Sequence, residues 1–131
     1  PIVGGDGWDS AKLIEIAGAD NLNNCYFGNH YSADDTSDEV KTFVANYQKA
    51  YNVKPDAPAA LAYDSVMILA KAIKDANSLD ADKVKDALAK ISNLKAVTGT
   101  ITYDENHDPV KSAVILTFKE GKQSFVTKIQ P

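Results

Sequence analysis

The residues best suited to chemistry lie near the amino terminus, in the segment Gly4-Gly5-Asp6-Gly7-Trp8-Asp9-Ser10. This glycine-rich turn follows the strand-like pair Ile2-Val3, and open α/β sheets bind ligands at the carboxyl ends of their strands. The spacing matches neither of the common phosphate-binding loops, and the segment contains no lysine. Because two carboxylates repel phosphate and attract positive charge, the turn favours a cation, an amine or a hydroxyl-rich ligand.

Each of these side chains also has a purely structural interpretation. Asp6 could stabilise the turn, and Asp9 or Ser10 could cap the helix that follows. Trp8 could be a core residue or an aromatic residue of a pocket. These alternatives remain open on the residues alone.

Other polar clusters do not indicate a metal site. Asp34, Asp35 and Asp38 lie close to His30 in sequence, but carboxylates also gather at the start of a helix for electrostatic reasons. The segment 104–109 resembles the first half of a calcium loop, yet it has proline where that loop needs glycine. We therefore predict no metal.

The sequence carries no signature of an enzyme. Neither histidine lies near a G-x-S-x-G turn, and Cys25 lies in an apolar run, where a thiol is usually inert. Asp64 lies within a predicted apolar helix and is better explained by a buried hydrogen bond than by acid–base catalysis. We predict no catalytic residue and no cofactor.

Composition excludes several classes of protein. The 131 residues carry a net charge of -4, with 44% hydrophobic and 24% charged residues. No apolar run reaches the roughly 18 residues that a membrane-spanning helix needs. No basic cluster is available to neutralise nucleic-acid phosphates. A single cysteine cannot form an internal disulfide, so a hydrophobic core must stabilise the fold.

The pattern of apolar residues predicts an α/β fold in the order βαβ, three helices, then strands. A short buried strand at Ile2-Val3 precedes a helix that ends at Gly18. The remaining predicted elements are a strand at 25–27, helices from Thr36, over 59–76 and from Asp80, and strands at 98–103, 112–118 and 123–129.

Several details of these elements can be predicted from capping and packing patterns. Thr36 and Glu39 fit a capping box, and Leu79 is placed to contact Val84 across the start of its helix. The helix over 59–76 has the widest apolar stripe, which predicts the most buried helix of the chain.

Two short apolar strands at the start cannot cover three amphipathic helices. The chain also opens on a strand, with neither an initiator methionine nor a leader segment. We therefore expect this chain to be a fragment of a longer protein, and we expect it to self-associate because apolar faces remain uncovered.

Five segments together resemble the carboxyl-terminal part of a periplasmic substrate-binding protein of the branched-chain amino acid ABC importer type. The resemblance covers essentially the whole chain. The segments are Gly4–Asp9, Asn29–Ser32, Phe43–Tyr47, Pro58–Asp64 and Thr98–Asn106.

The resemblance implies part of a two-lobed type I periplasmic-binding-protein fold, whose lobes are joined by three hinge crossings and close on a ligand. It assigns residues 1–28 to the second lobe and residues 29–97 to a helical segment of the first lobe. Residues 98–131 would form a hinge crossing and the last strands of the second lobe. The N-terminal part of the two-lobed protein would be absent.

The resemblance also implies roles for three residues. Asp6 matches the acidic residue that holds the α-amino group of an amino-acid ligand, Trp8 lines the same pocket, and Ala60 forms part of its wall. The residues that hold the ligand carboxylate would lie outside this chain. Two departures are the shorter carboxylate of Asp6, which leaves the ligand identity open, and His107, which replaces a glycine and should adopt a left-handed conformation.

The function that the resemblance implies is that of an extracytoplasmic solute-binding protein. It would bind a small amine-bearing ligand, such as a branched-chain amino acid, and deliver it to an ABC permease. It would lie in the periplasm, or on the cell surface as a lipoprotein in a Gram-positive organism. The alternative is an extracytoplasmic sensor module of a signalling receptor with the same fold.

Overall fold

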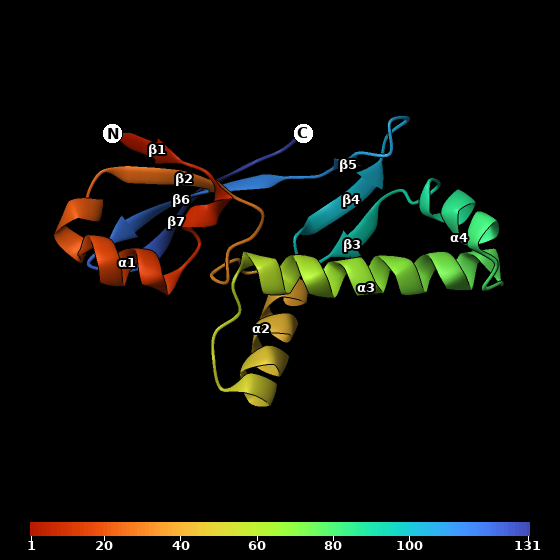
Figure 1. Ribbon diagram of the computed structural model, residues 1–131, viewed down its shortest axis with the longest axis horizontal. Coiled ribbons are helices and arrows are strands. Elements are labelled where there is room, and N and C mark those ends of the chain that lie inside the picture. The colour runs from red at the N-terminus through yellow and green to blue at the C-terminus, as the bar shows by residue number, and fades with distance from the viewer.

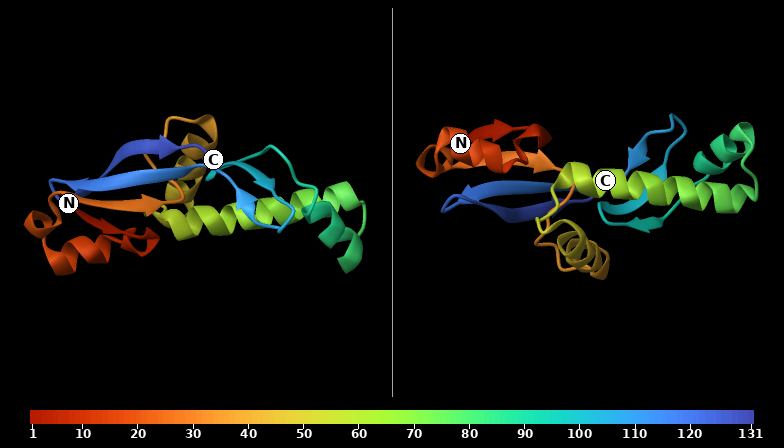
Figure 2. Two further views of the ribbon diagram at one scale, coloured as in Figure 1. Left: turned by 90° about the horizontal axis from the view of Figure 1, so that it is seen from above. Right: turned by 60° about the horizontal axis from the view of Figure 1, so that its bottom comes forward.

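A computed structural model describes residues 1–131 and divides the chain into two parts that lie side by side along the long axis (Figure 1). We call them the sheet part and the helical part, and Figure 2 shows the same separation from two other directions. None of the helices combines the length and the apolar character needed to cross a membrane.

The sheet part contains four strands in the order β1-β2-β6-β7, with β1 parallel to β2 and the other pairs antiparallel. Its elements are β1 (Ile2–Gly4), the 3-10 helix η1 (Asp6–Trp8), α1 (Ala11–Ala17), the 3-10 helix η2 (Ala19–Leu22), β2 (Cys25–Asn29), β6 (Ala113–Lys119) and β7 (Lys122–Ile129). Phe27 is fully buried and stacks on Phe118, with 5.3 Å between the ring centroids. The apolar side of α1 packs against this core.

The helical part is formed by residues 38–110, which lie between β2 and β6 in the sequence. Its elements are α2 (Asp38–Tyr51), α3 (Ala57–Ala76), α4 (Ala81–Leu88) and a three-stranded antiparallel sheet of β3 (Leu94–Ala96), β4 (Gly99–Tyr103) and β5 (Pro109–Val110). Residues 30–37 and 111–112 connect the two parts, and we call these segments the junction. The carboxyl end of β7 returns to the junction, because Ile129 pairs with Ala113.

The burial of two predicted elements differs from expectation. The predicted strand at Ile2-Val3 forms, but it lies at the edge of the sheet with Val3 76% exposed, so the prediction that it is buried is wrong. Helix α3 contributes more buried residues than any other helix, yet Val66 on its open side is 67% exposed. The exposed apolar residues of both elements lack a covering layer within this chain.

An apolar groove lies between α2 and α3 and has a volume of about 1150 Å³. We call it the α2–α3 groove. Its apolar lining includes Phe43, Tyr47, Tyr63, Val66 and Met67. Monomeric soluble proteins rarely expose a contiguous apolar surface of this kind without a partner for it.

The capping predictions that depend on a single residue are confirmed at Gly18 and Asp80. Gly18 ends α1 with a positive φ of 78°, and Asp80 accepts a hydrogen bond from the Lys83 N–H at 3.2 Å. The capping box at Thr36 is wrong, since α2 begins at Asp38 after Ser37. The contact predicted for Leu79 is also wrong, because this side chain is exposed.

The three predicted carboxyl-terminal strands are confirmed as β4, β6 and β7, whereas the short strands β3 and β5 were not predicted. His107 adopts the left-handed conformation expected for it, with φ at 68°.

Candidate functional site

Asp6 lies at the edge of the sheet where the parallel strands β1 and β2 end. Asp6 is the first residue of η1, separated from the end of β1 by one residue, and His30 directly follows β2. The carboxylate Oδ2 of Asp6 lies 3.1 Å from Nε2 of His30. Both side chains remain accessible, at 63% exposed for Asp6 and 40% for His30. The site therefore presents an accessible carboxylate whose partner is a partly exposed imidazole.

Trp8 is the last residue of η1 and packs against the core of the sheet part. Its ring centroid lies 6.4 Å from that of Phe27. The indole also covers Gly4 so closely that a Cβ added at that glycine would clash with the ring. Trp8 therefore packs as a core residue, one of the two roles that the sequence allowed. Its contact with a ligand stays a prediction.

Ala60 lies in the buried core of the helical part, whereas Asp6 lies on the surface of the sheet part. Its side chain is 0% exposed and belongs to the core cluster that Tyr31, Phe43 and Val97 help to form in the helical part. Here it acts as a packing residue near the start of α3. Its predicted contact with a ligand stays a prediction.

Asp9 was not predicted to connect the two parts. Its Oδ2 accepts a hydrogen bond from the Ala57 N–H at 2.7 Å, and its Oδ1 accepts one from Nε2 of Gln123 at 2.8 Å. Ser10, rather than Asp9, caps α1 by accepting from the Lys12 N–H at 3.2 Å. The local pattern allowed either residue to cap α1, and only the tertiary fold shows that Asp9 caps α3 instead.

The junction contains a partly buried lysine. Nζ of Lys111 donates to the carbonyl oxygens of His30 at 3.4 Å and of Thr98 at 3.3 Å. Burial lowers the pKa of the Lys111 ammonium, although the charge of Asp64 opposes this shift. Lys111 therefore joins both connecting segments to the β3–β4 turn.

An ion pair forms a further connection across the junction. Nζ of Lys128, near the end of β7, lies 2.9 Å from Oδ2 of Asp35. Burial raises the pKa of the Asp35 carboxyl, but hydrogen bonds from the Ser37 N–H and from Lys128 outweigh it, so the pKa lies below its ordinary value of 3.8. A neighbouring carboxylate, Asp34, pairs separately with Lys54 at 2.9 Å. No cluster of three or more potential metal ligands forms in this chain.

The lowered pKa of Asp35 gives a testable dependence of stability on pH. A carboxyl whose pKa is depressed in the folded state stabilises the fold above its unfolded pKa, and this contribution is lost as the pH falls through the folded pKa. We expect the free energy of unfolding to fall less between pH 5 and pH 3 in Asp35→Asn than in the unmodified chain, as measured by urea denaturation at both pH values. Glu105→Gln, at an exposed turn, is the matched control. Identical pH dependence in all three proteins would contradict a stabilising role for the ion pair.

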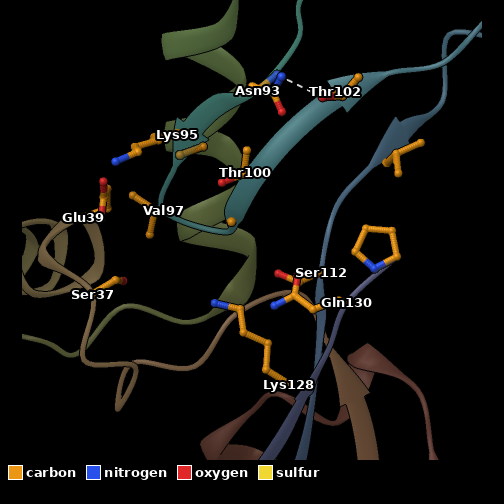
Figure 3. Close-up of a pocket in the computed structure, with 14 residues that line it drawn as sticks. Ser37, Glu39, Asn93, Lys95, Val97, Thr100, Thr102, Ser112, Lys128 and Gln130 are labelled. Carbon is orange, nitrogen blue, oxygen red and sulfur yellow. Dashed lines mark hydrogen bonds between the residues drawn. The ribbon is translucent and has the colours of Figure 1, made fainter.

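A polar cavity of about 390 Å³ lies beside the junction (Figure 3). Glu39 and Lys95 of the helical part lie on one side, and Ser112, Lys128 and Gln130 lie on the other. None of the predicted ligand-binding residues lines this cavity. The predicted site at Asp6 is thus a separate, open surface.

The chain matches known proteins along nearly its whole length. The family model described as periplasmic binding protein matches residues 1–123. A Leu/Ile/Val-binding protein homolog of Brucella suis is 31% identical over 131 residues, a match that covers 98% of this chain and 34% of the relative.

Two solved structures resemble this chain closely, each with a TM-score of 0.89. One is a leucine-binding protein of Thermotoga maritima, 37% identical over 99% of this chain and 37% of its own. The other is a branched-chain amino acid transporter substrate-binding protein of Streptococcus pneumoniae in complex with isoleucine, 36% identical over 100% of this chain and 37% of its own.

These matches confirm the predicted fold class, part of a type I periplasmic-binding-protein fold. The chain spans about a third of the length of the relatives that it matches. With a family model that matches nearly all of its residues, the chain belongs to the periplasmic binding protein family.

Proposed function

We propose that this chain is the carboxyl-terminal portion of an extracytoplasmic solute-binding protein of an ABC importer. The sheet part and the helical part would belong to its two lobes, which close on an amine-bearing ligand, most simply a branched-chain amino acid. The relatives support this ligand class by their names, and the sequence similarity extends over the whole chain. The full-length protein would then deliver the ligand to a permease.

The observation that carries the proposal is the exposed carboxylate of Asp6. It lies at the carboxyl end of a strand, where α/β sheets bind ligands, and it contacts only one exposed side chain within hydrogen-bond distance. Hydrogen bonds that involve charged groups are roughly twice as strong as neutral ones, so a carboxylate is well suited to hold an ammonium group. The amine of a ligand would replace His30 as the partner of Asp6.

Hinged closure explains how such a site becomes selective. A ligand that contacts both lobes binds the closed arrangement more tightly, so its differential affinity sets the population of that arrangement. Groups for the ligand carboxylate would come from residues outside this chain. The proposal is tested by calorimetric titration of the full-length protein with a panel of amino acids, where failure to bind any of them would refute it.

We further propose that, in the full-length protein, residues outside this chain cover the α2–α3 groove. Expressed alone, the 131-residue chain is expected to self-associate through this groove, because an exposed apolar face recruits a partner. Sedimentation velocity should show dimers or larger species at micromolar concentration. Val66→Lys should shift the distribution toward monomer, because Val66 is exposed and lines the groove.

The matched control for this experiment is Ile16→Lys, which introduces the same charge at an exposed apolar residue of α1 outside the groove. This control should leave self-association unchanged. A compact monomer at all concentrations, or equal effects of the two substitutions, would contradict self-association through the groove.

A further inference from the structure

One carboxylate connects three elements that are distant in sequence. Asp9 lies between η1 and α1 of the sheet part, Gln123 lies in β7 of the same part, and Ala57 is the first residue of α3 in the helical part. We call this arrangement, with hydrogen bonds of 2.7 Å to the Ala57 N–H and 2.8 Å to the Gln123 amide, the Asp9 clasp.

The strand register places the Gln123 end of the Asp9 clasp away from the junction, whereas Asp9 lines one cavity with Tyr31 and Ser32 of the junction. Asn29, at the end of β2 where the chain leaves the sheet part, pairs with Val114. Gln123 pairs with Phe118, four residues further along β6, or about 13 Å at the rise of a strand. Because Asp9 and Ala57 belong to different parts, a rotation of the parts about the junction changes the distance between them, while Asp9 and Gln123 stay together in the sheet part.

The chemistry of the Asp9 clasp favours a strong contact. The first N–H groups of a helix have no partner within the helix and form the positive end of its dipole. Asp56 satisfies only one of them, the Ala59 N–H, at 2.9 Å. Asp9 supplies the acceptor for a second one, and the Ala57 residue that donates is buried. Gln123 holds the other oxygen of the carboxylate and so fixes its orientation.

We propose that Asp9 is a positioning residue that favours the closed arrangement of the two lobes. This inference rests on the proposed function, because it assumes that the lobes open and close on a ligand and takes the arrangement described here as the closed one. Both carboxylate oxygens of Asp9 already have partners within the chain, so the Asp9 clasp stabilises the closed arrangement and raises its population before the ligand binds. The apparent affinity of the full-length protein rises with that population.

The test measures the separation of the two lobes in the full-length protein by electron-spin resonance. Spin labels replace Ile16 in α1 and Leu79 before α4, both highly exposed, whereas the native Cys25 is buried. In the absence of ligand, Asp9→Ala should shift the distances toward longer values, and saturating leucine should restore the unmodified distances. The dissociation constant for leucine should rise about tenfold, as expected when a charged hydrogen bond across the lobes is lost.

The matched control is Asp20→Ala, which removes an exposed carboxylate of the sheet part that accepts no side-chain hydrogen bond across the lobes. If Asp9→Ala does not fold, Gln123→Met keeps the carboxylate and removes its orienting partner, and it should cause a smaller shift in the same direction. Distances and affinity equal to those of Asp20→Ala would overturn the inference. If the unmodified protein binds no amino acid, the proposed function fails, whereas the ligand-free distances still test the Asp9 clasp.

Discussion

Asp6→Asn in the full-length protein is expected to weaken the binding of amino acids by about 10- to 150-fold. This range corresponds to the loss of a hydrogen bond between charged groups, worth about 1.5–3 kcal/mol. Asparagine keeps the size of the side chain and one acceptor oxygen, but it removes the negative charge that would hold the ligand ammonium. Calorimetric titration of both proteins with leucine at one pH and one salt concentration measures the effect.

The matched control is Asp20→Asn, which makes the same change of charge at an exposed residue of the sheet part. Its affinity for leucine should equal that of the unmodified protein. Because Asp6 is exposed and pairs only with an exposed imidazole, Asp6→Asn should leave the melting temperature nearly unchanged. Equal affinities of Asp6→Asn and Asp20→Asn would show that Asp6 does not hold the ligand amine.

Asp64→Ala is expected to cause the largest loss of stability, about 3–5 kcal/mol in the free energy of unfolding. The Asp64 carboxylate is 3% exposed and accepts hydrogen bonds from the N–H groups of Val97 at 2.9 Å and Thr98 at 2.8 Å. Both donors are buried, and each buried donor left without a partner costs about 1–3 kcal/mol. Urea denaturation followed by circular dichroism measures this loss.

Asp75→Ala on the same helix provides the comparison. The Asp75 side chain is partly exposed and pairs with Lys71 within one face of α3, so its removal should cost no more than about 1 kcal/mol. A loss for Asp64→Ala as small as that for Asp75→Ala would mean that the buried carboxylate does not anchor the β3–β4 turn to α3.

Local signals in the sequence predicted much of the fold. Asp80 marks the start of a helix because its side chain accepts a hydrogen bond from a free backbone N–H, and Gly18 marks a helix end because it adopts a positive φ. The apolar run Cys25-Tyr26-Phe27 of β2 and the β-branched and aromatic run of β6 likewise predict strands. The short strands β3 and β5 give too little periodic pattern to be recognised.

Uncovered apolar faces were expected, but the exposure of Val3 and Val66 in particular could not be predicted, because an apolar pattern indicates that a residue can be buried but not which segment covers it. The same limit applies to Asp9. Its partners are 48 and 114 residues away along the chain, so local capping rules assign it to the wrong helix.

The candidate site was predicted only in part. Asp6 was identified from the glycine-rich turn after a strand, and its position beside another strand end agrees with that reasoning. The contact with His30 was not predicted, although the parallel pairing of two strands that end at Gly4 and Asn29 would have indicated it. Ala60 came from the resemblance alone, and nothing in the sequence indicated that its side chain would be fully buried.

If Asp6 holds the amino group of an amino acid, the full-length protein must distinguish an amino acid from an analogue without that group. The most direct measurement is a pair of calorimetric titrations, one with leucine and one with 4-methylpentanoate, which lacks only the amino group. We predict binding of leucine and a loss of at least about tenfold in affinity for the deaminated analogue, a difference that disappears in Asp6→Asn. Equal affinity of the unmodified protein for the two ligands would contradict the account.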